Sequence, residues 1–351
     1  MHGHDTLALE TQTIHTPVLV RWRRTVLQFS RRRPLGAAGA AIIVLMILCA
    51  ITAHAITPYD PLETDFAAQL TPPSAQHWLG TDAFGRDLLS RLIYGSRTAL
   101  LVGFASALLG ASLGALIGVT SAYFGGQIDL VMQRVVEIFL AFPIIILALA
   151  VVSILGTGVW NVIVAIMIPM IPNCARVVRA SALAVRAMPY VEAARATGCG
   201  HWRIIFRHML PNVMAPYLIM LTAYVGQAIL LEASLSFLGL GVAEPTPAWG
   251  LMLRGAAVEF AESAPWMAIF PGLAISLGVF AFNLFGDSLR DALDPKLRIL
   301  CRERLHSLCH RPRGPNTIMA MPRKHTPAPM TSQRSGRWPS IIHCHRTAMA
   351  M

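Results

Sequence analysis

The chain has 351 residues, of which 55% are hydrophobic and only 13% are charged. These proportions exclude an ordinary soluble globular domain, in which charged residues make up about a quarter of the chain. Of the net charge of +11, residues 301–351 contribute +8, from nine Lys or Arg against one Glu. The remainder is nearly neutral, so no nucleic-acid-binding module is indicated. The composition predicts an all-α membrane protein.

Residues 1–34 form a basic segment, and the uncharged run 35–56 that follows is long enough to cross a hydrocarbon core of about 30 Å. The run ends in Ala53-His54-Ala55, which resembles a signal-peptide cleavage site. The long basic region and five later spans favour an uncleaved first helix instead. Before it, apolar residues at helical spacing among the arginines predict either an amphipathic surface helix or a solvated anchor: Trp22, Val26 and Phe29.

Five further spans follow a predicted external loop over residues 57–97. An uncharged stretch from 138 to 175 is too long for one helix, and Gly156-Thr157-Gly158 divides it into the third and fourth spans. We expect Pro169 to bend the fourth span and Pro172 to lie near its end. The other spans are predicted over residues 99–124 (second), 213–231 (fifth) and 263–285 (sixth).

The distribution of Lys and Arg predicts the orientation, because positive residues are retained on the cytoplasmic side. With the N-terminus inside, the cytoplasmic flanks carry sixteen Lys or Arg residues. The external loops carry four, beside eight acidic residues. Both termini are therefore expected in the cytoplasm, with a short cytoplasmic end over 288–298. The basic tail 299–351 lacks a sustained apolar period and is expected to be disordered.

A cytoplasmic loop over residues 175–212 separates the fourth and fifth spans. Within it we predict a short helix from about Tyr190 to Thr197, because Pro189 can open a helix at its first turn. Gly198 or Gly200 can end that helix in a left-handed cap. We therefore expect a short helix parallel to the membrane surface.

Motifs in this loop resemble those of a known family. Glu192-Ala193-Ala194, then Gly198 six residues after the glutamate, then Leu210-Pro211, resemble the EAA loop of bacterial ABC-importer permeases. His208 stands where that pattern usually has an apolar residue, and the ending RHMLPN resembles the dipeptide, oligopeptide and nickel permease branch. Other segments are similar to the same branch: residues 77–82 (HWLGTD), 85–91 (GRDLLSR), 236–241 (SFLGLG), 245–250 (PTPAWG) and 286–295 (GDSLRDALDP).

The resemblance extends over about residues 30–298 and is greatest to the second, C-type, member of a permease pair. It implies a six-helix type I ABC-importer permease of the bacterial inner membrane, with a core of five helices over residues 98–287. The partners it implies are a second homologous permease, two ABC ATPase subunits and an external solute-binding protein, besides membrane lipid. The transported solute, a dipeptide, an oligopeptide, nickel or another small solute, stays open.

The resemblance also assigns the coupling role. It implies that six residues join the chain to an ATPase: Glu192, Ala193, Ala194, Gly198, Leu210 and Pro211. The two alanines allow close approach of a partner, whereas the plainer alternative is that Glu192 only caps a surface helix. A phosphate-binding loop of the form GxxxxGK[ST] is absent, because neither Lys296 nor Lys324 follows a glycine-rich loop. We expect ATP and Mg²⁺ to bind to partner chains and no cofactor to bind to this one.

Two other functional classes, a secondary transporter and an intramembrane protease, fit the sequence less well. A secondary transporter driven by an ion gradient would place carboxylates near the bilayer midplane, whereas Glu232 is expected near the outer face. Glu232 either lines a solute route with Ser234 and Ser236 or is a polar residue at a helix end. An intramembrane protease would need a nucleophile beside a base, and only His54 lies within a predicted span. The six cysteines show no CxxC pairing, so neither a disulfide framework nor a metal site is predicted.

Overall fold

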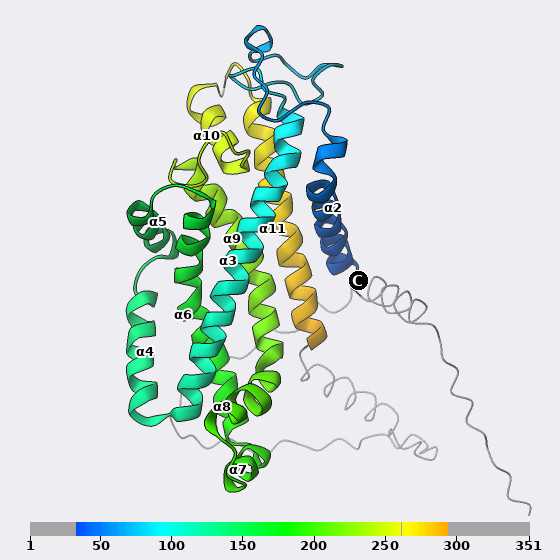
Figure 1. Ribbon diagram of the computed structural model, residues 1–351. Coiled ribbons are helices and arrows are strands. Elements are labelled where there is room, and N and C mark those ends of the chain that lie inside the picture. Colours follow the sequence, from blue (N-terminus) through cyan, green and yellow to red (C-terminus); the bar gives the residue numbers. More distant parts are fainter. Residues whose placement is uncertain (1–32, 261, 294–351) are drawn as a thin grey trace, which may run out of the picture. The chain divides into compact units, whose positions relative to one another are not determined.

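The computed structural model describes residues 33–260 and 262–293. The predictions for the basic segment up to residue 32 and for the tail 299–351 therefore lie outside the described residues. In the described part the chain is helical apart from turns, loops and one isolated bridge between Thr81 and Asp87. The extended segment 57–87 and the short helix α7 (Pro189–Ala196) lie at opposite ends of the helical bundle (Figure 1). We call these ends the loop end and the α7 end.

Within residues 33–260 and 262–293, five helices are long and apolar enough to cross a membrane, or six spans if a bent pair of helices counts as one. The all-α membrane fold is thereby confirmed. Besides α7, the elements are α2 (Pro34–Ile56), η1 (Phe66–Ala68), α3 (Leu88–Phe124), α4 (Gly126–Leu140), α5 (Ile144–Leu155), α6 (Val159–Arg186), α8 (His201–Ile204), the π-helical turn η2 (Ile205–Met209), η3 (Leu210–Val213), α9 (Met214–Phe237), α10 (Trp249–Glu259) and α11 (Trp266–Leu293).

Helix α3 begins eleven residues before residue 99, where the second span is predicted to start, so the helix includes the last part of the predicted loop 57–97. The Asp87 carboxylate caps α3 by accepting a hydrogen bond of 2.8 Å from the Ser90 amide. Charges in the first turns find partners in the preceding segment: Arg91 donates to the Pro61 carbonyl and Arg97 to those of Ala50 and Ile51. The hydropathy of residues 88–97 predicted a loop because Arg91 and Arg97 are charged, and hydropathy takes no account of hydrogen-bond partners elsewhere in the chain.

In place of the predicted third span, one helix starting near residue 138, the structure has two helices separated by a break. Helices α4 and α5 meet at an angle of 90°. Pro143 lacks an amide hydrogen and restricts the residue before it, so the helix breaks there. The predicted division at Gly156-Thr157-Gly158 is confirmed, since both glycines have positive φ between α5 and α6.

The fourth crossing does not end near Pro172, as predicted, but continues to Arg186. Pro169 and Pro172 are both buried inside α6, where packing by neighbouring helices offsets the lost hydrogen bonds. The following stretch is rich in Ala, Val, Leu and Arg, most of which favour helix. Helices α9 and α11 also extend further than predicted, to Phe237 and Leu293.

Helix α3 contacts α6 and α9, and α11 joins α9 to α2. The α3–α6 contact depends on glycines spaced one helical turn apart. A Cβ built on Gly114 would lie 2.6 Å from the Ile171 carbonyl oxygen, and one on Gly118 would lie 2.5 Å from that of Ala175. Small residues at such positions let helix backbones approach closely in a membrane.

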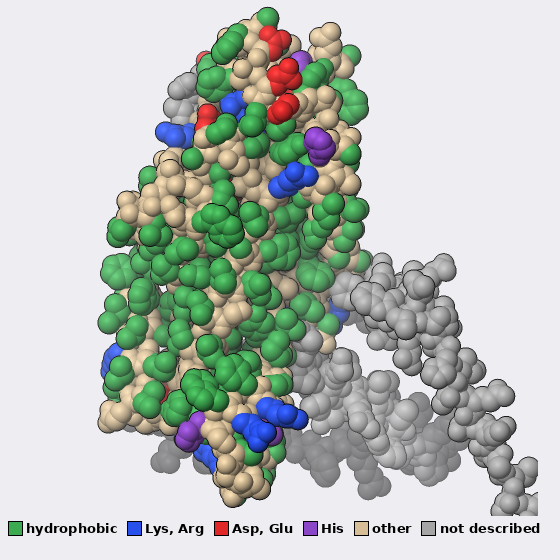
Figure 2. Space-filling view, in the orientation of Figure 1, with side chains coloured by type: hydrophobic (Ala, Val, Ile, Leu, Met, Phe, Trp, Pro, Cys, Tyr) green, Lys and Arg blue, Asp and Glu red, His purple; other side chains and the backbone are tan. Residues whose placement is uncertain are grey.

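Charge and apolar surface separate along the bundle. On the face shown in Figure 2, hydrophobic side chains cover the middle, whereas most of the visible acidic side chains lie at the loop end. Lys, Arg and His side chains gather around the α7 end of that face. This pattern is that of a protein whose middle is solvated by lipid and whose ends meet water.

Replacing Gly114 with Ala is expected to destabilise the protein by roughly 1–3 kcal/mol, because the added methyl group overlaps α6. The measurement is the thermal unfolding midpoint of the purified chain in detergent. Gly272→Ala is the matched control, since a Cβ at Gly272 in α11 meets no atom of another described element within 4 Å. That variant should leave the midpoint unchanged or raise it. Equal midpoints for the wild type and Gly114→Ala would contradict the packing argument.

Candidate functional site: the coupling segment and the loop end

Helix α7 forms where the sequence predicts it, with Pro189 in its first turn. The predicted span, Tyr190 to Thr197, differs from the observed Pro189–Ala196 by one residue at each end. Pro189 fits there because its fixed φ suits a helix and its missing amide hydrogen would be unpaired in any case. α7 lies apart from the crossing helices at its end of the bundle (Figure 1).

The end of α7 is a Schellman motif centred on Gly198. The Gly198 amide donates to the Arg195 carbonyl at 3.0 Å, and the Cys199 amide donates to the Ala194 carbonyl at 3.1 Å. Gly198 has φ of +76°, which only glycine and, less readily, asparagine adopt at low cost. A Cβ built on Gly198 meets no atom within 4 Å in the described part of the chain, apart from the residues next to it in sequence. The glycine is required here by its backbone angle, and the space beside it is open.

The EAA residues face two ways. Glu192 and Ala193 are exposed, whereas Val191 and Ala194 are buried against the rest of the chain. The helical period turns Ala194 inward, so of the two alanines only Ala193 is exposed in this chain. Glu192 lies in the first turn of α7, where the helix dipole favours a negative charge. Among the residues that the structure describes, its carboxylate forms no hydrogen bond or ion pair.

Leu210 and Pro211 lie away from α7, in the turn that leads into α9. Pro211 cannot donate a hydrogen bond one turn back, and the chain widens into the π-helical turn η2 before narrowing into η3. Leu210 packs against the core, and Pro211 is exposed. These two residues shape the junction between the coupling segment and the fifth crossing. By the coupling segment we mean residues 186–204, from the last residue of α6 to the last residue of α8.

Large apolar side chains are exposed around α7. Trp202 is 62% exposed and Phe206 is 51% exposed, and their rings stack with centroids 5.9 Å apart. Met188, just before α7, and Tyr190, in its first turn, are also exposed. We call these four residues the exposed apolar residues. None of them is among the site residues predicted from the sequence, although Trp202 and Phe206, four residues apart, have the spacing of residues that share a helix face.

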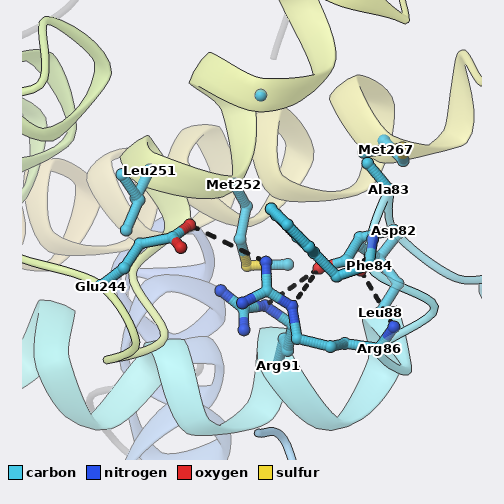
Figure 3. Close-up of a pocket in the computed structure, with 11 residues that line it drawn as sticks. Asp82, Ala83, Phe84, Arg86, Leu88, Arg91, Glu244, Leu251, Met252 and Met267 are labelled. Atoms are coloured by element: carbon cyan, nitrogen blue, oxygen red, sulfur yellow. Dashed lines mark hydrogen bonds and ion pairs between the residues drawn. The ribbon is translucent and has the colours of Figure 1, made fainter. Parts of the chain in front are cut away.

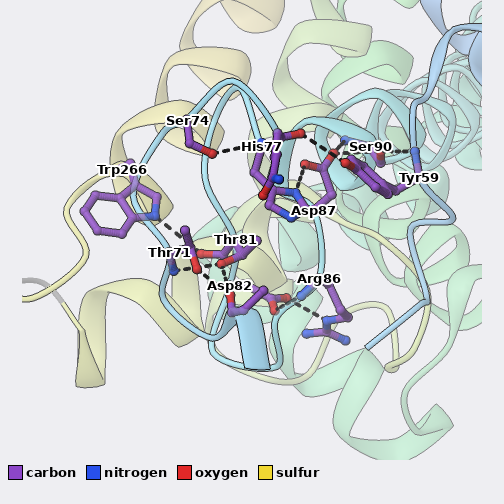
Figure 4. Close-up of polar contacts among 12 residues, drawn as sticks. Tyr59, Thr71, Ser74, His77, Thr81, Asp82, Arg86, Asp87, Ser90 and Trp266 are labelled. Atoms are coloured by element: carbon purple, nitrogen blue, oxygen red, sulfur yellow. Dashed lines mark hydrogen bonds and ion pairs between the residues drawn. The ribbon is translucent and has the colours of Figure 1, made fainter. Parts of the chain in front are cut away.

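The loop end carries a network of buried charges (Figures 3 and 4). The Asp82 carboxylate accepts hydrogen bonds from the amides of Phe84 and Arg86 and from Arg86 Nε at 2.6 Å. His77 Nδ1 lies 3.0 Å from the Asp87 carboxylate that caps α3. The HWLGTD and GRDLLSR segments thus form one compact polar unit.

This unit borders a small cavity of about 60 Å³ whose lining includes Arg86, Arg91 and Glu244. Arg91 is 1% exposed, and its Nε lies 3.7 Å from Asp82 without a hydrogen-bond partner among the described residues. Arg86 Nη2 lies 3.8 Å from Glu244, which comes from the loop before α10. The network therefore joins the start of α3 to the loop between α9 and α10.

The suggested solute-route residues are not gathered on an open surface. Glu232 is fully buried, and the Ser236 hydroxyl donates to it at 2.8 Å. The following loop folds back, so that the Val242 amide donates to the Ser236 oxygen at 3.2 Å. Ser234 is only half-buried and donates to the Leu230 carbonyl. In this conformation Glu232 and Ser236 are both buried within the chain, so the solute route through them stays a prediction.

Comparison with known proteins identifies the family. Residues 110–299 match the family described as the binding-protein-dependent transport system inner membrane component. Residues 21–73 match the N-terminal transmembrane domain of oligopeptide transport permease C. A solved structure of the MetNI methionine ABC transporter in an inward-facing conformation is similar to 59% of this chain and 98% of that chain, with 19% identity and a TM-score of 0.48.

Two relatives are similar over nearly their whole length. The dipeptide transport system permease protein DppC of Alkalihalophilus pseudofirmus is 43% identical over 79% of this chain and 90% of the relative. The glutathione transport system permease protein GsiD of Pectobacterium atrosepticum is 41% identical over 83% of this chain and 95% of the relative. The chain therefore belongs to the family of binding-protein-dependent transport system inner membrane components, as an inner-membrane permease rather than an enzyme.

Proposed function

We propose that this chain is the permease subunit of an ATP-binding-cassette importer that docks on an ATPase through the outer face of α7. One observation carries the proposal: Glu192 and Ala193 of α7 are exposed, and so are the four exposed apolar residues in and around α7, at the end of the bundle where basic side chains gather. Exposed apolar groups next to charged ones are typical of a protein interface. The small Ala193 side chain lets a partner approach the helix backbone.

The orientation follows from the same proposal. The α7 end faces the cytoplasm, where an ATPase works, and the loop end faces the external solute-binding protein. The excess of basic residues in the predicted cytoplasmic flanks supports this assignment. ATP and Mg²⁺ are held by two ATPase subunits, and a second, homologous permease completes the translocation path.

The transported solute is proposed to be a short peptide. The supporting observation is that two relatives above 40% identity are named as dipeptide and glutathione permeases, and glutathione is itself a small peptide. Nickel is supported only by the resemblance of the motifs to that branch. Identifying the ligand that copurifies with the cognate solute-binding protein tests this assignment, and a metal complex in place of a peptide would overturn it.

Gly198→Val is expected to abolish ATP-driven uptake while the protein still inserts into the membrane. A β-branched residue at φ of +76° costs about 1–2 kcal/mol, enough to disrupt a cap that ends an eight-residue helix. The measurements are uptake by cells and the amount of permease in their membranes. Gly198→Asn is the control, because Asn tolerates this conformation, and it should retain most of the uptake. Normal uptake by the Val variant would refute the coupling role.

Cysteines placed on the two faces of α7 should behave differently in crosslinking. Ala193→Cys is expected to crosslink to a cysteine in the ATPase, because residue 193 is exposed. Ala194→Cys should not, because residue 194 is buried against this chain. The experiment uses the assembled transporter in membranes and detects a disulfide-linked band. Equal crosslinking at both positions, or reaction of Ala193→Cys with a reagent confined to the external side, would contradict the docking face and its orientation.

A further inference from the structure

The inner end of α3 is contacted by three residues that flank or belong to α7. Arg186 ends α6 just before α7, Arg195 lies within α7, and His201 begins α8 just after it. All three reach the four residues 122–125 at the turn from α3 to α4. A helix of eight residues is too short to be stable alone, so these contacts fix where α7 stands.

Tyr123 is the centre of this group. Its side chain is 4% exposed, and its hydroxyl lies 2.7 Å from His201 Nδ1, which is hydrogen-bond distance. The Arg195 guanidinium lies 4.8 Å from the centre of the Tyr123 ring, within the range of a cation–π interaction. The Tyr123 and His201 rings also meet edge to face, with centroids 5.6 Å apart. One side chain therefore holds α7 and α8 at once.

Arg186, which precedes α7 in the sequence, contacts the same turn between α3 and α4. Its Nη1 donates to the Ala122 carbonyl at 2.9 Å. Gly125 leaves room for this guanidinium, because a Cβ at residue 125 would lie 2.5 Å from the same nitrogen. The start and the end of the coupling segment are thus tied to one turn of backbone.

We infer that Tyr123 is a positioning residue that fixes the coupling segment to α3, so that a displacement of α7 moves α3 as a unit. The inference rests on the proposed function, because it takes α7 as the element that the ATPase moves. Helix α3 has 37 residues and is about 55 Å long at a rise of 1.5 Å per residue. Its far end carries Asp87 and Arg91 of the buried charge network. α3 therefore links the coupling segment directly to the loop end.

The first experiment measures how firmly the segment is held, without any ATPase. Cys199 is a half-buried free thiol between α7 and α8, two residues before His201. In a full-length chain whose other cysteines are replaced by Ala, the rate of Cys199 alkylation by a maleimide in membrane vesicles reports opening of the segment. Tyr123→Phe loses the hydroxyl but keeps the ring over Arg195, and Tyr123→Leu loses both.

We expect alkylation about fivefold faster in Tyr123→Phe, since a net hydrogen bond contributes about 1 kcal/mol, and more than tenfold faster in Tyr123→Leu. Tyr217→Phe is the matched control, because the Tyr217 hydroxyl lies 3.0 Å from Ser112 Oγ and joins α9 to α3 away from α7. It should change the rate less than twofold. Adding His201→Ala to Tyr123→Phe should give no further increase beyond His201→Ala alone. Unchanged rates in both Tyr123 variants, or an equal response to Tyr217→Phe, would overturn the inference.

The second experiment uses the assembled transporter in proteoliposomes and measures ATP hydrolysed per solute imported. The ratio should rise several-fold in Tyr123→Leu and less in Tyr123→Phe. The ATPase continues to hydrolyse ATP in these variants, but less of the movement of α7 is passed on to α3. Faster Cys199 alkylation with an unchanged ratio would overturn transmission through Tyr123. Failure of the proposed function is distinguishable, since it would appear as normal ATP-driven uptake by Gly198→Val, whatever the Tyr123 variants do.

Discussion

The close backbone contact between α3 and α6 is the constraint on which the rest of the bundle depends. Lipid is as apolar as the side chains of these helices, so the hydrophobic effect does not drive helices together within it. Association requires close packing, and Gly114 and Gly118 remove the side chains that would hold α6 away. With α6 seated, α3 also contacts α9, α9 contacts α11, and α11 contacts α2. The positions of the other crossings are therefore set relative to α3.

Among the described residues, a group of paired charges lies near each end of this assembly. At the loop end Asp82 neutralises Arg86, with Arg91 nearby, and at the α7 end Arg179 contacts both oxygens of Asp129, at 2.7 and 2.5 Å. Paired charges of this kind add little net stability, but removing one partner leaves the other buried and unpaired. They fix register more than they strengthen the fold. α3 is consequently held at both ends by specific polar contacts and along its middle by small residues, which suits an element that moves as one body.

The sequence predicts most of this fold, because crossing helices are defined by composition over some twenty residues. The glycine division before α6, the opening of α7 at Pro189 and its end at Gly198 are also local, and the structure agrees with each of them. The bounds predicted from the sequence were wrong where contacts with residues distant in the chain determine where a helix begins or ends. The start of α3 carries Arg91 and Arg97, whose partners lie in the preceding segment, and α6 runs through Pro172 because it is packed on its neighbours. In the coupling segment, neither the burial of Ala194 nor the contact of Tyr123 with His201 could be predicted, because each depends on how the chain folds. Tyr123 and His201 are 78 residues apart in the sequence.

A coupling helix has to satisfy two demands that conflict. It must expose enough surface to bind a partner, and it must be attached firmly enough that the partner's motion is not lost in bending. An eight-residue helix cannot meet the second demand from its own hydrogen bonds. Here the two demands fall on different faces: Glu192 and Ala193 stay open, whereas Val191 and Ala194 pack inward. The firmness comes from the contacts of Arg186, Arg195 and His201 with the end of α3. Under the proposed function, force applied to the open face would pass to α3 through these three side chains, so docking and transmission can be altered separately.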